Sequence, residues 1–194
     1  NDSDADGLLD GVETNTGVFL DSSNTGTNPL DADTDDDGLI DSVETNTGVL
    51  IGVDDRGTDP LAADTDADGF EDGFEVSENS NPNDAAIVPT RLIAVSSSEN
   101  GTITGFGSFP LGSSTNLEAT ANLGYIFAEW NGDAVGSQNP LPVVADSNIL
   151  ISALFTQDQR DPDGDGLSNY QELIIHETDP NDADTDGDGF NDSI

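Results

Sequence analysis

Residues 2–13 read DSDADGLLDGVE, and this pattern returns at residues 33–44, 64–75 and 161–172. A fifth copy begins at Asp184 and reaches Ile194, one residue before its twelfth position. Counted from the first Asp, every copy has Asp at positions 1, 3 and 5, Gly at position 6, and Asp or Asn at position 9; the complete copies end in Glu at position 12. A solvated acidic tail would show no such fixed spacing of its Asp and Gly residues. The pattern therefore marks a repeated loop, whose positions we number 1 to 12.

The spacing is that of a calcium-binding loop. Carboxylates at alternate positions converge on one ion, and Gly at position 6 permits the sharp turn. Position 7 offers its backbone carbonyl, and Glu at position 12 closes the shell with two oxygens. The sequence therefore predicts Ca²⁺ as the cofactor.

The predicted ligands are the side chains at positions 1, 3, 5, 9 and 12 and the backbone carbonyl at position 7. In chain order they are Asp2, Asp4, Asp6, Leu8, Asp10 and Glu13; Asp33, Asp35, Asp37, Leu39, Asp41 and Glu44; Asp64, Asp66, Asp68, Phe70, Asp72 and Glu75; Asp161, Asp163, Asp165, Leu167, Asn169 and Glu172; and Asp184, Asp186, Asp188, Phe190 and Asp192.

The charge of the chain excludes several partners. Its 194 residues include 41 acidic side chains and three cations, Arg56, Arg91 and Arg160, which gives a net charge of −38. Without a basic patch, such a chain repels nucleic acid and anionic lipid. One Ca²⁺ in each of five loops would still leave a charge of about −28. We therefore expect about five or more ions, with either more ions than loops or a surface that stays strongly acidic for solubility.

Other features of the composition limit what can stabilise the chain and where it can lie. Cys and Met are absent, so disulfides cannot stabilise it. No apolar run approaches the roughly 18 residues of a membrane-spanning helix, so we expect no membrane insertion, and no signal peptide is visible. Because residue 2 is already a predicted ligand and residue 194 lies inside a loop, we interpret the chain as a piece of a longer secreted or cell-surface protein.

The repeat spacing divides the chain into three parts. Loops one to three recur every 31 residues and loops four and five after 23, and Thr-Asp-Pro precedes loops three and five. The eight additional residues of the longer repeat, as in 16–20 and 47–51, mix apolar and turn-forming residues, which predicts a small hairpin or extended arm. We expect calcium-binding repeats at 1–87, a different domain at 88–157, and repeats again at 158–194.

The repeats are too thin to hold a hydrophobic core of their own. Leu39, Ile40 and Val43, like Leu167, Tyr170, Leu173 and Ile174, have the spacing of one or two helical turns. So few apolar side chains cannot stabilise a fold without metal ions or disulfides. We expect calcium to supply much of the folding free energy and the repeats to stack in a line.

The middle part has the pattern of a small, mostly antiparallel β-sheet. The expected strands are 91–97, 101–105, 115–121, 125–130, 141–144 and 149–155. The last alternates between two faces, with Ile149, Ile151, Ala153 and Phe155 on one of them. Trp130 fits a core position in phase with Phe127 better than a sugar-stacking platform on the surface.

The outer parts resemble bacterial thrombospondin type 3 repeats. The resemblance is carried by DPDGDGLSNYQE at 161–172, Thr-Asp-Pro at 178–180 and DTDGDG at 184–189. It implies Asp side chains wrapped around rows of calcium ions, with little other core. It further implies that Asp59 and Asp179, before the prolines, are ligands shared between neighbouring sites, although the first repeat has Asn28 at that place. The cysteines of the animal repeats are absent, so calcium would act without disulfides.

The middle part resembles the divergent internalin B-repeat domain of bacterial surface proteins. The resemblance is carried by NGTI at 100–103, LEATA at 117–121, GYIF at 124–127, WNGD at 130–133 and ALF at 153–155. It implies a small β-grasp-like sheet that serves as a spacer or adhesive unit.

We expect no enzyme in this chain. His176, the only histidine, has no Cys or second His for a zinc site and no nucleophilic Ser for a triad. The carboxylates that could form a glycosidase pair are almost all assigned to calcium loops.

The sequence therefore predicts a calcium-binding structural or adhesive segment that acts as a calcium-rigidified spacer or stalk. Two alternatives stay open: a subunit of a calcium-dependent extracellular fibre, and a non-catalytic accessory arm of a secreted hydrolase. The expected partners besides calcium are other surface proteins, glycans or copies of the chain itself.

Overall fold

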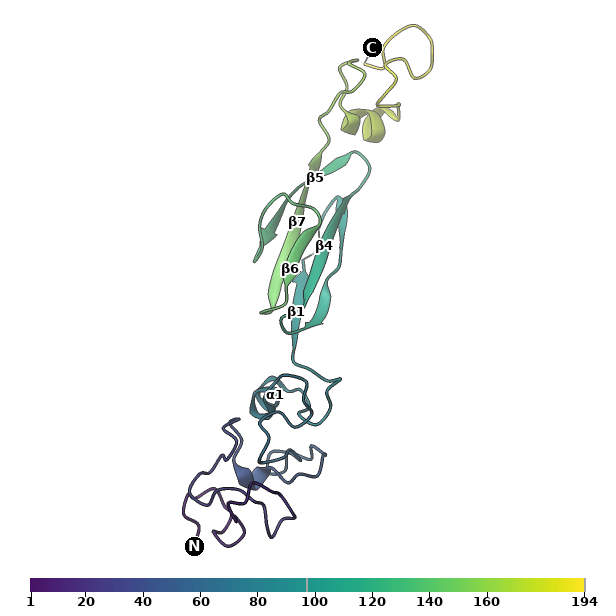
Figure 1. Cartoon of the computed structure of the whole chain (residues 1–194). Helices are drawn as coiled ribbons and strands as arrows, with labels where there is room; N and C mark the ends of the chain where they lie inside the picture. Colours follow the sequence, from purple (N-terminus) through teal and green to yellow (C-terminus); the bar gives the residue numbers. More distant parts are fainter. Residues whose placement is uncertain (97, 194) are drawn as a thin grey trace. The chain divides into compact units, whose positions relative to one another are not determined.

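The computed structural model describes residues 1–96 and 98–193 and divides into two compact units, Asn1–Pro89 and Thr90–Ile194 (Figure 1). We call these unit 1 and unit 2. Ser97, the last residue of one expected strand, and Ile194, the last residue of the fifth loop, lie outside the described residues.

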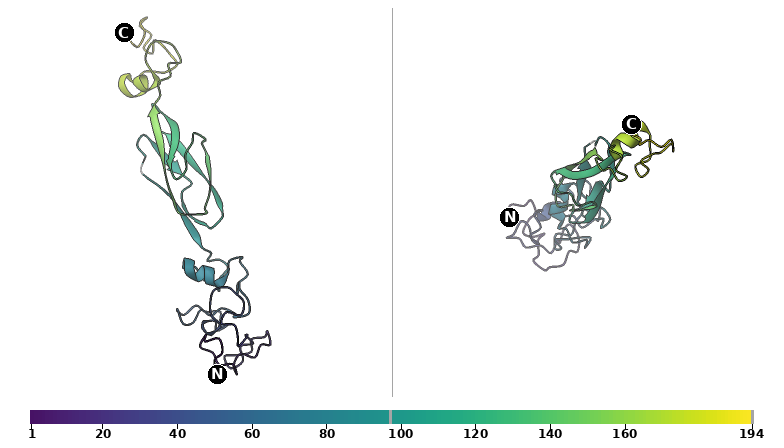
Figure 2. Two further views of the ribbon diagram at one scale, coloured as in Figure 1. Left: turned by 90° about the vertical axis from the view of Figure 1, so that its left-hand side faces the viewer. Right: turned by 90° about the horizontal axis from the view of Figure 1, so that it is seen from above.

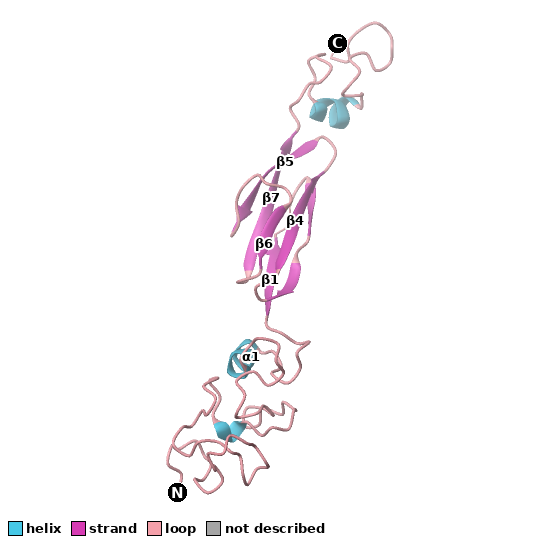
Figure 3. Ribbon diagram, viewed as in Figure 1, coloured by secondary structure: helices cyan, strands magenta, loops and turns pink. Residues whose placement is uncertain are grey.

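Unit 1 consists almost entirely of loops (Figure 3). Its helices are a 3₁₀ helix, η1 (Asp41–Val43), and an α-helix, α1 (Asp72–Glu78). Both begin at position 9 of their loop, so the helical turns predicted after the Gly are confirmed for loops two and three. The first loop has only a hydrogen-bonded turn there.

The residues between the loops of unit 1 form hairpin-like arms, as predicted. Asn15 N–H donates to the Thr27 carbonyl (2.8 Å), and Asn46 N–H makes the same bond to Thr58 (2.7 Å) one repeat later. A Cβ on Gly26, whose φ is +76°, would overlap the backbone of the opposite side of the arm. The arm therefore needs Gly at this point, because another residue would be both strained and too large.

Unit 2 begins with a β-domain of seven strands (Figure 2). The strands are β1 (Thr90–Val95), β2 (Gly101–Thr104), β3 (Gly107–Pro110), β4 (Ser114–Ala121), β5 (Tyr125–Gly132), β6 (Leu141–Val144) and β7 (Ile149–Gln157). One sheet has the order β3-β1-β7-β5 and the other the order β2-β4-β6. All six predicted strands are present, with ends that differ by at most two residues.

The expectation of a single sheet was wrong, because the strands form two sheets. The mostly antiparallel pairing is confirmed, with one parallel pair, β1 with β7, in the register Ile93↔Ile149. β3 was missed because its four residues include Gly107 and Pro110, which are unfavourable in strands. Both are tolerated because β3 lies at the edge of its sheet, where one side of the strand needs no hydrogen-bonded partner.

The core of the β-domain lies between the sheets. Trp130, Ile93, Leu117 and Ile151 are each 0% exposed, and they come from both sheets. The Trp130 indole N–H donates to the Gln138 carbonyl (2.8 Å), which satisfies its buried polar atom. The prediction that Trp130 is a core residue is confirmed.

Unit 2 ends with loops four and five. Loop four contains a π-helix, η2 (Gln171–His176), which ends where Glu177 takes a left-handed conformation with φ +61°. The helical turn predicted after the Gly of loop four is therefore confirmed. In the described part of loop five, a turn takes its place.

Replacing Trp130 by Ala should destabilise the β-domain by about 3–5 kcal/mol, because a large cavity would open between the sheets. The free energy of unfolding can be measured by urea denaturation in saturating calcium, followed by circular dichroism. Val135→Ala is the control, since Val135 is 73% exposed. Equal effects of the two substitutions would contradict the assignment of Trp130 to the core.

Candidate metal centre

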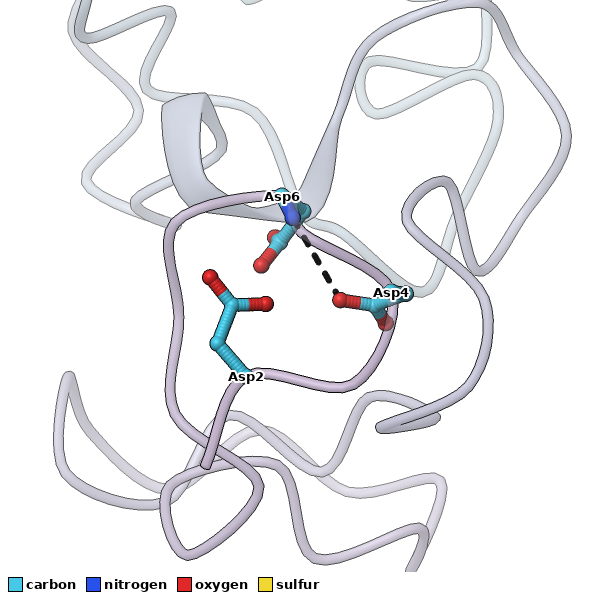
Figure 4. A group of neighbouring side chains, drawn as sticks. All are labelled: Asp2, Asp4 and Asp6. Atoms are coloured by element: carbon cyan, nitrogen blue, oxygen red, sulfur yellow. Dashed lines mark hydrogen bonds between the residues drawn. The ribbon is translucent and has the colours of Figure 1, made fainter.

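The carboxylates at positions 1, 3 and 5 converge within each loop of unit 1. In the first loop, Asp2, Asp4 and Asp6 each bring an oxygen within 4.8 Å of the others (Figure 4). The same grouping occurs at residues 33, 35 and 37 and at residues 64, 66 and 68. Like charges at this separation disfavour one another, so a cation or a proton would stabilise each group.

Backbone hydrogen bonds hold each loop in this shape. The carboxylate at position 5 accepts the N–H of position 7, as from Leu8 to Asp6 and from Leu39 to Asp37 (both 2.7 Å). The position-6 Gly lies in the left-handed region in all five loops, with φ between +94° and +112°. Gly at position 6 is therefore required by the backbone, as the motif predicts.

The Asp at position 9 is tied to position 2 of its own loop. Asp41 accepts the N–H of Thr34 (2.8 Å) and its hydroxyl (2.7 Å). Asp72 accepts the same pair from Thr65, and Asp192 the same pair from Thr185. These bonds orient the position-9 carboxylate across the loop.

The structure brings position 9 close to the preceding loop, which sequence reasoning did not predict. Asp41 groups with Asp6 and Glu13 of loop one, and their three carboxylates lie within 4.8 Å of one another. Asp37, Glu44 and Asp72 form the equivalent group between loops two and three, and all six residues are buried. The constant 31-residue period indicated that the contacts between loops repeat, but not which positions make them.

Position 10 of loops two and three contacts the loop before each of them. Ser42 N–H donates to Asp6 Oδ2 (3.1 Å), and Gly73 N–H donates to Asp37 Oδ2 (3.1 Å). A Cβ on Gly73 would overlap the Asp37 carbonyl oxygen. In unit 2, Ser193 of loop five donates its hydroxyl to the Asp165 carbonyl of loop four (2.7 Å).

The position-12 glutamates are, with Asp41 and Asp72, the most deeply buried of the acidic side chains. Glu13, Glu44, Glu75 and Glu172 are at most 2% exposed. Glu13 Oε2, Glu44 Oε2 and both carboxylate oxygens of Glu75 and Glu172 have no hydrogen-bond donor. Burying an unpaired carboxylate costs several kcal/mol, so these oxygens need a cation or a proton.

The pKa values of these glutamates reflect that need. Burial, reinforced by neighbouring Asp charges, raises the pKa of Glu44 to about 9. The same causes raise the pKa of Glu13, Glu75 and Glu172 to about 7. The Asp residues that act on each Glu include positions 3 and 5 of its own loop, so the Glu faces the converging carboxylates.

The residues before the prolines act as turn formers. Asp59 Oδ1 accepts Leu61 N–H (3.2 Å), and Asp179 Oδ1 accepts Asn181 N–H (3.1 Å). The uncharged Asn28 makes the same kind of bond in the first repeat. A role of Asp59 and Asp179 as ligands stays a prediction.

His176 lies beside loop five. A cavity of ≈ 300 Å³ is lined by His176 and by Asp186, Asp188 and Asp192, among others. Sequence reasoning missed this neighbourhood, because the histidine and the loop are separated by the turn around Pro180.

Two known families match parts of the chain. Residues 91–159 match the family described as the divergent InlB B-repeat domain. Residues 64–85, 161–183 and 184–194 match the bacterial TSP3 repeat. Both resemblances inferred from the sequence are thereby confirmed, and they indicate a structural segment of a bacterial surface or extracellular protein. No curated protein and no solved structure matches significantly. Among the described residues, no helix is both long and apolar enough to span a membrane.

Without metal, the fold of unit 1 should lose stability as the pH rises. Between about pH 4.5 and 7, and up to about 9 for Glu44, the folded chain keeps protons that the unfolded chain has released. The free energy of unfolding should therefore be larger at pH 5 than at pH 8 in the metal-free chain. The fraction of unit 1 that is folded at each pH, read from the amide NMR signals of residues 1–89, reports this free energy even where the metal-free unit is mostly unfolded.

In saturating calcium the order should reverse, because ions and protons compete for the same oxygens. Greater stability of the metal-free chain at pH 8 than at pH 5 would contradict the assignment of raised pKa values to these glutamates.

Proposed function

We propose that the loops are calcium sites and that bound calcium holds unit 1 in its folded form. The observation that carries this proposal is the set of buried position-12 glutamates with unbonded oxygens. Every donor at these sites is a hard oxygen, mostly from carboxylates, which favours Ca²⁺ over softer transition metals.

The geometry supports two kinds of ion position. One lies inside a loop, among positions 1, 3, 5 and 12. The other lies between successive loops, among positions 5 and 12 of one loop and position 9 of the next, as in Asp6, Glu13 and Asp41. A position of the second kind is also supported between loops four and five, because the charge of Asp192 raises the pKa of Glu172. This arrangement holds more ions than loops, in line with the charge of −38.

Calcium is needed because unit 1 has almost no hydrophobic core. Besides Pro and Gly, Leu39 is the only apolar residue buried among the described residues of this unit. The other buried side chains are carboxylates, including Asp6 and Asp37, and hydroxyls such as those of Thr27 and Thr58. A core of carboxylates repels itself until cations occupy it, so ion binding and folding are one event.

We infer that the chain is a calcium-rigidified spacer of a secreted or cell-surface bacterial protein. Calcium at extracellular concentrations, matched to sites of about 10⁻⁴–10⁻³ M, would close the loops and stiffen the repeats. The β-domain, with its own core, would stay folded without the ion and serve as a β-grasp-like spacer or adhesive unit. No catalytic role is assigned to any residue.

Glu44→Gln should reduce the number of bound ions by at least one, because Glu44 contributes to both kinds of ion position. The wild-type chain should bind more than five Ca²⁺ in native mass spectrometry. At the affected sites the affinity for calcium should fall by about 10–100-fold or more. Glu118→Gln is the matched control, since Glu118 is exposed on β4.

An equal ion count for Glu44→Gln and Glu118→Gln would remove Glu44 from the proposed sites. A wild-type chain that binds no calcium would refute the proposed function itself.

A further inference from the structure

Loop four differs from the loops described above in what precedes it. Loops two, three and five each follow another loop, whereas loop four follows strand β7. Its position 9 is Asn169 rather than Asp, and the residue before its position 1 is Arg160, where those three loops have Ala. Both differences fall where a loop meets its predecessor.

Asp158 connects the β-domain to loop four through its side chain. It is 4% exposed, and its carboxylate accepts Arg160 Nε–H (2.8 Å) and Nη2–H (2.5 Å). Asn169 Nδ2–H donates to the same carboxylate (2.8 Å). The Asp158 carboxylate is thereby paired with one guanidinium and one amide. An Asp at position 169 would place a second negative charge against Asp158.

The backbone of Asp158 makes the same connection. Its N–H donates to the Gly124 carbonyl in the β4–β5 turn (2.9 Å), and its carbonyl accepts Tyr170 N–H (3.0 Å). Position 10 is Tyr170, whose ring packs edge to face on Tyr125 of β5 with ring centroids 5.3 Å apart. A Cβ on Gly124, at φ +76°, would come within 2.7 Å of Ile174 in η2.

Positions 9 and 10 therefore dock loop four onto the β-domain, as they dock loops two and three onto their predecessors. The difference is the source of positive charge. Between loops, three buried carboxylates meet and no cationic side chain is among them. At the end of β7, one carboxylate meets one guanidinium and one amide.

We propose that the Arg160 guanidinium takes the place of a metal ion where loop four contacts the β-domain, so that loop four is anchored there without calcium. We call each such contact between a loop and the part of the chain that precedes it a joint. The proposal rests on the proposed function, because it contrasts one metal-free joint with calcium-dependent joints. It predicts that positions 9 and 10 of loop four keep their structure when calcium is removed.

The chain contains internal controls for a test by hydrogen exchange. The N–H of position 9 donates to the carbonyl of the residue before position 1 in each loop: Asp41 to Ala32 (3.0 Å), Asp72 to Ala63 (2.9 Å) and Asn169 to Arg160 (2.8 Å). Exchange of these amides is measured by NMR on the full chain in calcium and in EGTA. In EGTA, Asn169 and Tyr170 should stay protected, while Asp41 and Asp72 should exchange freely.

The outcomes separate the two proposals. Loss of protection at Asn169 together with Asp41 and Asp72 would overturn the proposal of a metal-free joint but would agree with the proposed calcium sites. Protection of all three amides in EGTA would instead refute the calcium dependence of unit 1, and with it the contrast that defines the joint.

Arg160→Gln tests the role of the guanidinium. In EGTA, the protection of Asn169 should fall by about 10–100-fold, because hydrogen bonds to the charged Asp158 are lost. Arg91→Gln is the control, since it removes the same charge from β1, and it should leave Asn169 unchanged. Unaltered protection in Arg160→Gln, with the β-domain folded by circular dichroism, would overturn the proposal.

Discussion

The fold of unit 1 depends on the carboxylates buried in its repeats, which need a cation or a proton as a partner. Glu13, Glu44 and Glu75 are removed from water with oxygens that nothing in the protein satisfies. Their free energy depends on a partner from solution, either a divalent cation or a proton. Hydrophobic burial cannot offset that cost here, since Leu39 is nearly alone as a buried apolar side chain among the described residues of the unit. The arms and turns around the loops depend on that partner as well.

Two adjacent positions, 9 and 10, make the contacts between successive loops. Position 9 brings a charge to the preceding loop, and position 10 brings a backbone N–H, as Asp41 and Ser42 do. Where the predecessor is the β-domain, the same two positions carry Asn169 and Tyr170, an amide and an aromatic ring. The residue types at positions 9 and 10 therefore differ with the surface that the loop contacts. The hydrogen bond from the position-9 N–H to the residue before position 1 is the same in both cases.

The sequence predicted most of what is determined locally. The loop pattern fixed the Gly at position 6 and the convergence of positions 1, 3 and 5, because these depend on neighbouring residues. Segments rich in β-branched and aromatic residues predicted six strands, the last with clean alternation, and the apolar surroundings of Trp130 predicted its burial. Contacts between distant residues were not predicted: the division into two sheets, the parallel pairing of β1 with β7, and the meeting of Glu13 with Asp41. Asp158 and Arg160 are close in sequence, but their role in anchoring loop four depends on contacts with Asn169 and the β4–β5 turn, which the sequence does not reveal.

The most direct test of calcium-dependent folding is an amide NMR spectrum of the metal-free chain, recorded as calcium is added. The account predicts that signals of residues 1–89 are poorly dispersed without calcium and disperse as the ion is added, while those of the β-domain stay dispersed throughout. Dispersed signals from residues 1–89 in the absence of any divalent cation at neutral pH would show that the buried carboxylates need no ion, and would contradict the account.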